Sequence, residues 1–191
     1  MAVPGQLPSQ ALVYEVLSEG LEPEFQRLEA RRLQTVTYPA WRWQNTVFVS
    51  LQVDSKATDP YSGGGFRVEL EKSDNKLPAL GLNGRAMFFQ LLTLADLQPL
   101  LERQNEVIRG LPRPPRKQVD LYPAGRVRDR YLAYFEPQAS FGGVQSWLRF
   151  HSVEDVMCWA PLLSPLLGTL MSRAEALLRV DERSLGKGSL L

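Results

Sequence analysis

Two short segments with strictly alternating apolar residues place the strongest constraint on how this chain folds. Residues 47–53 and 66–70 each carry an apolar side chain at every second position, which puts those side chains on one face of a strand. The residues between them, 54–65, include Asp59-Pro60 and three consecutive glycines, a composition typical of turns. The pattern therefore predicts an antiparallel hairpin over residues 46–72.

The alternation also predicts the register of this hairpin. Directly opposed residues share a face, so pairing Val53 with Phe66, and Val49 in step with Leu70, brings the apolar sets together. The other face then carries mostly polar side chains, namely Phe48, Ser50, Gln52, Arg67, Glu69 and Glu71. An antiparallel sheet of this kind is expected to turn its polar face to solvent or to a ligand.

The composition is that of an ordinary globular protein. The chain has 191 residues, of which 44% are hydrophobic and 23% are charged, and a net charge of +1. That length favours one domain, and so small a net charge gives no general attraction to nucleic acid or to an anionic membrane. We expect a single α+β domain over residues 1–180 and a flexible tail over residues 181–191.

Targeting and cysteine signals favour a soluble cytoplasmic protein. The N-terminus shows no basic segment followed by an apolar core, and the most apolar segment, residues 161–171, is too short to span a bilayer. Cys158 is the only cysteine and His151 the only histidine, which excludes an internal disulfide and a His/Cys metal site. We expect His151 to be structural and Cys158 to be an inert thiol in the hydrophobic core.

The rest of the chain predicts helices packed on one face of an antiparallel sheet of about four or five strands. Caps, prolines and apolar spacing predict helices over residues 11–18, 24–33, 94–110, 128–135, 152–159 and 164–179, with breaks at Gly20 and Pro161. Residues 34–45 are expected to form an edge strand and residues 146–150 another strand. For residues 85–92 a strand is favoured, and a helix remains open. We expect the helices over residues 94–110 and 164–179 to cover the apolar face.

The most basic stretch of the chain runs from Arg109 to Arg130, where seven Lys and Arg residues accompany two Asp. Its first part, residues 109–117, is rich in proline and is expected to be non-helical. The first interpretation of this stretch is a connector that crosses the surface of the protein and binds nothing. The second is a patch that faces phosphates, formed by Arg113, Arg116, Arg126, Arg128 and Arg130. The third is a proline-rich ligand, in which Arg109, Pro112 and Pro115 fit an aromatic groove.

Two tryptophans flank Arg42 at the start of the hairpin region. Trp41 and Trp43 could provide an aromatic platform for a base or a peptide. The alternative is structural, with one ring in the core and the other over the edge of the sheet.

One group of carboxylates supports an enzymatic alternative. Asp54 followed by Glu69-Leu70-Glu71-Lys72 is similar to the acidic core of restriction-type nucleases, in which an Asp and a second acidic residue hold a divalent metal. That resemblance implies Asp54, Glu69 and Glu71 as ligands of Mg²⁺ or Mn²⁺. In the predicted register, however, Asp54 and Glu69 lie about 13 Å apart, and Arg67 between them favours an ordinary ion network.

The sequence thus favours a non-enzymatic binding or assembly module without a cofactor. Its candidate surfaces are the polar sheet face with Arg67, the two tryptophans, and the basic segment of residues 109–130. The expected partner is another protein, with nucleic acid as a weaker possibility and no membrane. A metal-dependent phosphodiesterase or nuclease is the alternative.

Overall fold

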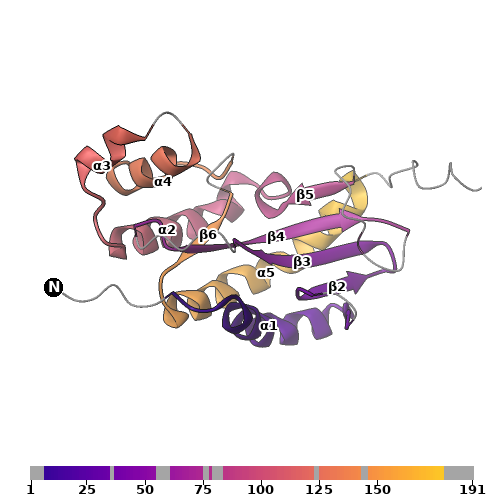
Figure 1. Ribbon diagram of the computed structural model, residues 1–191. Helices are drawn as coiled ribbons and strands as arrows, with labels where there is room; N and C mark the ends of the chain where they lie inside the picture. The colour runs from indigo at the N-terminus through magenta and orange to yellow at the C-terminus, as the bar shows by residue number, and fades with distance from the viewer. Residues whose placement is uncertain are drawn as a thin grey trace, which may run out of the picture.

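The computed structural model of the protein describes residues 7–34, 37–54, 61–74, 78, 84–122, 125–142 and 146–178. These residues form an α+β fold with helices on one face of an antiparallel sheet, as the sequence predicts (Figure 1). The strands are β1 (Arg31–Arg32), β2 (Ala40–Trp43), β3 (Val47–Val53), β4 (Gly64–Lys72), β5 (Arg85–Met87) and β6 (Leu148–Phe150). The α-helices are α1 (Gln10–Arg27), α2 (Leu94–Gly110), α3 (Arg116–Leu121), α4 (Arg126–Phe135) and α5 (Val153–Leu177).

The predicted hairpin is β3 and β4, in the predicted register. Val53 lies opposite Phe66, and Val49 lies opposite Leu70. All four side chains pack in or against one hydrophobic core. The sheet runs β1-β2-β3-β4, and the far edge of β4 is shared by β5 and β6, which pair with residues 69–71 and 64–66 respectively. The described residues thus form a sheet of six strands, one more than the four or five that the sequence predicts.

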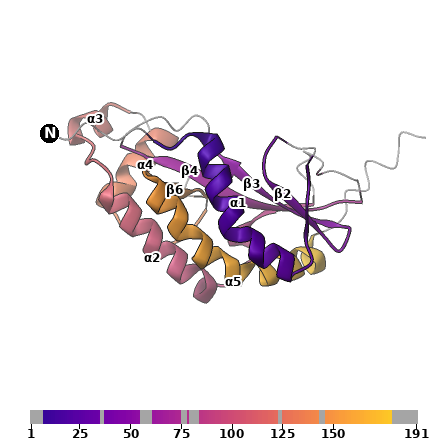
Figure 2. The same ribbon diagram turned by 90° about the horizontal axis from the view of Figure 1, so that it is seen from below.

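Three long helices cover the apolar face. In Figure 2, α1, α5 and α2 lie side by side in front of the sheet. α1 contacts β3, α5 contacts β3 and β4, and α2 lies against β6. Two of these helices were expected in that position, but the contribution of α1 was not, because its sequence was interpreted as two short helices.

Both predicted helix breaks are wrong. α1 continues through Gly20 and Pro23, and α5 continues through Pro161 and Pro165. A proline inside a helix removes one backbone hydrogen bond, which costs stability locally. Pro161 and Pro165 both face solvent, whereas Leu163 on the same helix is completely buried. Burial of the continuous apolar stripe along α5 therefore outweighs the lost hydrogen bonds.

Three further expectations change. Residues 31–32, predicted as the end of a helix, form the edge strand β1, so that β2 becomes an inner strand. Residues 85–92 are neither wholly strand nor wholly helix, since β5 leads into a 3-10 turn at Phe88–Gln90. Residues 116–117, expected to be non-helical, begin α3. Residues 181–191 lie outside the described residues.

The N-terminus of α2 begins as its sequence predicts. Thr93 accepts a hydrogen bond from the N–H of Asp96, and the Asp96 carboxylate accepts one from the N–H of Thr93. Among the described residues, neither this helix nor any other is long and apolar enough to cross a membrane.

Candidate binding surfaces

A buried ion-pair network occupies the polar face of the sheet. Glu69 is only 3% exposed, and its carboxylate pairs with the guanidiniums of Arg67 and Arg85. Arg85 also reaches Glu71 at 3.5 Å, and Arg67 lies 4.4 Å from the centre of a Trp147 ring. Most of this face is therefore buried, namely Phe48, Ser50, Glu69 and Glu71, whereas Gln52 and Arg67 are half-buried. The sequence predicts a face open to solvent or to a ligand. The ion network expected around Arg67 is present, with Arg85 as a partner that the sequence did not indicate.

The three carboxylates of the metal hypothesis do not converge. Asp54 follows β3, and its N–H donates to the carbonyl of Gly65, four positions before Glu69 along β4. The carboxylates of Glu69 and Glu71 pair with an arginine side chain, that of Arg85. No group of three His, Cys, Asp or Glu side chains in the described part of the chain is arranged to hold a metal ion. The Mg²⁺ or Mn²⁺ alternative therefore gains no support from the geometry.

The two tryptophans do not form a binding platform. Trp41 is completely buried, stacks on Phe25 with 4.0 Å between ring centres, and donates its indole N–H to Glu22 at 3.0 Å. Trp43 is half-buried and packs against the same core. Because the two residues are two positions apart on β2, both rings lie on the apolar side of the sheet.

The basic segment, by contrast, has exposed charge arranged around an aromatic ring. Arg113 precedes α3 and Arg116 opens it, and their guanidinium carbons lie 5.3 and 5.2 Å from the centre of the Phe135 ring of α4. Both arginines are exposed. The ring that the two guanidiniums share holds the charged groups in place, while both side chains remain exposed.

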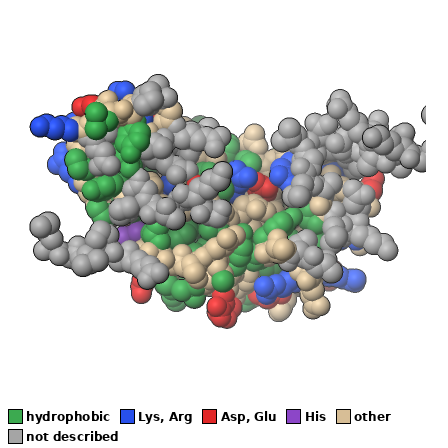
Figure 3. All heavy atoms as spheres, in the orientation of Figure 1, with side chains coloured by type: hydrophobic (Ala, Val, Ile, Leu, Met, Phe, Trp, Pro, Cys, Tyr) green, Lys and Arg blue, Asp and Glu red, His purple; other side chains and the backbone are tan. Residues whose placement is uncertain are grey.

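Two more exposed side chains on α3 continue this surface. Lys117 and Leu121 are one helical turn apart, and the Leu121 side chain is 82% exposed. Arg113, Arg116, Lys117, Leu121 and Phe135 are called the α3–α4 basic surface below. Figure 3 shows blue and green side chains next to one another at the upper left, where Figure 1 places α3 and α4.

Of the other arginines predicted for this segment, Arg128 is the one whose side chain is described. Arg128 is half-buried on α4. Arg126 and Arg130 also belong to α4, and the positions of their side chains lie outside the description.

The α3–α4 basic surface stands on a packed support. Val119 of α3 is completely buried, and Tyr131 of α4 is 2% exposed. Tyr131 meets Tyr122 and Tyr61 edge to face, with ring centres 5.6 and 6.0 Å apart. These contacts fix α3 against α4, so the exposed side chains are presented by a defined backbone.

The side-chain amides of two neighbouring residues on α2 bind the backbone of β6 and of the segment that follows α4. The Gln104 side chain accepts from the N–H of Arg149 at 2.8 Å and donates to the carbonyl of Trp147 at 2.9 Å, as a neighbouring strand would for β6. The Asn105 side chain pairs in the same way with the backbone N–H and carbonyl of Gln138. Each amide therefore satisfies two backbone groups that pair with no strand.

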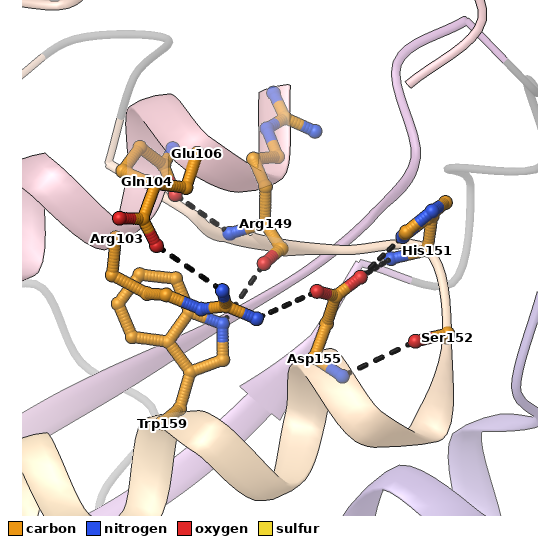
Figure 4. Close-up of polar contacts among 8 residues, drawn as sticks. All are labelled: Arg103, Gln104, Glu106, Arg149, His151, Ser152, Asp155 and Trp159. Atoms are coloured by element: carbon orange, nitrogen blue, oxygen red, sulfur yellow. Dashed lines mark hydrogen bonds and ion pairs between the residues drawn. The ribbon is translucent and has the colours of Figure 1, made fainter. Parts of the chain in front are cut away.

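A charged network joins α2 to the start of α5 (Figure 4). Asp155 accepts from Arg103 of α2 at 2.7 Å and from the backbone N–H of His151 at 3.0 Å, and the His151 ring contacts the same carboxylate. Burial alone would raise the pKa of Asp155. The hydrogen bonds from His151, together with the charges of His151 and Arg103, outweigh burial and hold that pKa below its usual value. The single histidine thus lies next to the Ser152 cap of α5. Cys158, predicted to lie in the core, is instead exposed on α5, because it falls on the solvent side of the helix next to the buried Trp159.

The geometry leaves one exposed candidate among the predicted sites, the α3–α4 basic surface. Sequence reasoning found Arg113 and Arg116 but missed Phe135, which lies outside the basic stretch. Comparisons of the chain with protein-family models, curated proteins and solved structures find no match.

Proposed function

We propose that this chain is a cytoplasmic, non-enzymatic binding module that holds an acidic segment of a partner protein on its α3–α4 basic surface. The observation that carries the proposal is the pair of exposed arginines, Arg113 and Arg116, packed over one aromatic ring. In the described part of the chain, no carboxylate pairs with Arg113, and Arg116 makes one exposed ion pair, with Asp120 at 3.6 Å. An acidic partner would supply the missing counter-charges.

The surrounding side chains favour a protein partner over a nucleic acid. Arginine and aromatic residues are enriched at the centres of protein interfaces, where an exposed apolar residue such as Leu121 also gains from burial. Nucleic-acid affinity comes mainly from many phosphate contacts along an extended basic track. This surface is compact instead, and the chain as a whole has a net charge of only +1.

Fluorescence anisotropy tests the proposal with a labelled peptide of about twelve residues that is rich in Glu and contains Leu and Phe. The double variant Arg113→Ala/Arg116→Ala should bind about tenfold more weakly than the unmodified protein, which corresponds to about 1.4 kcal/mol. Phe135→Leu should weaken binding less, because it removes the ring on which the arginines rest but keeps both charges.

The matched control is Arg31→Ala/Arg32→Ala, which removes two exposed arginines from strand β1. It should leave peptide affinity unchanged. Equal losses in the two double variants would show general electrostatic attraction and would overturn the proposal. Tighter binding of a labelled single-stranded RNA than of the peptide would overturn it in favour of a nucleic-acid partner.

A further inference from the structure

A groove of about 430 Å³ lies between the C-terminal halves of α2 and α4, on the side of α4 formed by Tyr134. Its lining residues are Glu102, Asn105, Glu106, Ile108, Arg109, Ala133, Tyr134 and Pro137. This volume is within the range of small-ligand sites in proteins. Of the residues named for the sites expected from the sequence, Arg109 alone lines this groove among the described residues.

Two carboxylates on α2 form the acidic part of the rim. Glu102 and Glu106 are one helical turn apart and both exposed, so their like charges repel. Glu102 accepts from Gln98 at 2.8 Å, and Glu106 pairs with Arg103 at 3.3 Å. Each contact uses only part of the accepting capacity of a carboxylate. A cation placed between the two would relieve the repulsion.

The ends of two helices add negative potential at the same place. α2 ends at Gly110 and α4 ends at Phe135, and the groove is lined by the last turns of both. The C-terminus of a helix carries partial negative charge on its free carbonyl groups and stabilises nearby cations.

The remaining walls are suited to an aliphatic stem. Ile108 is 6% exposed and, with Ala133 and Pro137, forms an apolar lining. Tyr134 contributes a half-buried aromatic ring, whose face attracts a cationic group.

We propose that this groove binds an organic cation, a guanidinium or ammonium group on an aliphatic stem. The stem lies against Ile108, Ala133 and Pro137, and the charged head lies between the two glutamates and the Tyr134 ring. The site is separate from the α3–α4 basic surface and does not depend on its function.

Among the described lining residues Arg109 is the only cation, and it allows a prediction of the opposite direction to that for the glutamates. Its Nε donates to the carbonyl of Asn105 at 3.1 Å, which holds the guanidinium along its own helix. Arg109→Gln removes a like charge from the rim, and the affinity for a cation should therefore rise by about two- to threefold.

The test is a calorimetric titration with n-butylguanidine, its neutral isostere n-butylurea, and the blocked peptide acetyl-Ala-Arg-Ala-amide. Butylguanidine should bind at one saturable site and butylurea should not. Glu102→Gln, Glu106→Gln and Tyr134→Leu should each weaken binding about three- to fivefold. The matched control Glu15→Gln removes an exposed glutamate from α1 and should change nothing.

The two cationic probes distinguish the natural sources of such a group. Tighter binding of the peptide supports an arginine side chain of a partner, and tighter binding of butylguanidine supports a free small cation. The proposal is overturned if neither cation saturates the protein, if butylurea binds equally well, or if Arg109→Gln weakens binding.

Discussion

Gly20 of α1 packs directly against Ala160 of α5. A Cβ atom added at Gly20 would lie 2.5 Å from the Cβ of Ala160, closer than two non-bonded carbon atoms can approach. The sequence suggests that this glycine ends a helix, but in the structure it lies inside α1 and permits the two helices to meet. The two helices can pack this closely only because Gly20 has no side chain.

The first prediction concerns this contact. Gly20→Ala should lower the free energy of unfolding by about 1–3 kcal/mol, because the extra methyl forces the helices apart. Gly168→Ala in α5 is the matched control, since its added Cβ would meet Leu28 at an ordinary 3.5 Å. That variant should be neutral or more stable by up to about 1 kcal/mol, through better helix propensity. Urea denaturation measures both, and equal effects would contradict the packing role of Gly20.

A second prediction concerns the amide that completes strand β6. Gln104→Leu keeps a side chain of similar size but leaves the N–H of Arg149 and the carbonyl of Trp147 without this partner. The free energy of unfolding should fall by about 2 kcal/mol or more. Gln98→Leu, an exposed position on the same helix, should change it by less than about 0.5 kcal/mol. Faster hydrogen exchange at the Arg149 amide in the first variant alone would locate the effect in β6.

The third prediction is a pH dependence at Asp155. The pKa of the Asp155 carboxyl is lower in the folded chain than in the unfolded chain, where an aspartate has a pKa of about 3.9. The ionised carboxylate therefore stabilises the fold fully above that pH, and this contribution is lost as the pH falls through the folded-state pKa. Asp155→Asn should be less stable than the unmodified protein at pH 7, and the gap should close in acid. A gap that stays constant down to pH 2 would contradict the assignment.

A fourth prediction separates the ion network from the metal alternative. Glu69→Gln removes the carboxylate shared by Arg67 and Arg85 and should lower the free energy of unfolding by about 2 kcal/mol. Mg²⁺, Mn²⁺ and Ca²⁺ should leave the melting temperature of the unmodified protein unchanged. A metal-dependent rise in melting temperature that Glu69→Gln and Glu71→Gln abolish would restore the phosphodiesterase hypothesis.

The hairpin could be predicted from sequence because its information is local. Period-two alternation fixes which side chains of β3 and β4 share a face, and only matched registers bury both apolar sets. Local sequence signals are not sufficient to predict the lengths of α1 and α5. Gly20, Pro23 and Pro161 carry strong local signals for helix ends, and the burial that overrides those signals comes from residues distant in the chain.

The candidate site also combines residues that local sequence features identify with a contact between distant residues that they do not. Clustered charge and proline in the sequence marked Arg113 and Arg116 as a surface segment. The ring that organises them, Phe135, is about twenty positions away, and a single sequence holds no signal for that contact. The polar sheet face was misjudged for a related reason. Alternation shows that Glu69 and Arg67 point away from the core, but it cannot show that Arg85 pairs with Glu69 or that Trp147 lies against Arg67.

Photo-cross-linking tests the central claim most directly. A benzoylphenylalanine side chain replaces Lys117 on the α3–α4 basic surface, and the protein is irradiated in a nuclease-treated extract of the cells from which it comes. We predict an adduct with one acidic protein, which disappears in the Arg113→Glu/Arg116→Glu background and does not form when the same group replaces Gln98. Contradictory results would be no adduct, an adduct that survives the charge reversal, or one that forms only when nucleic acid is left intact.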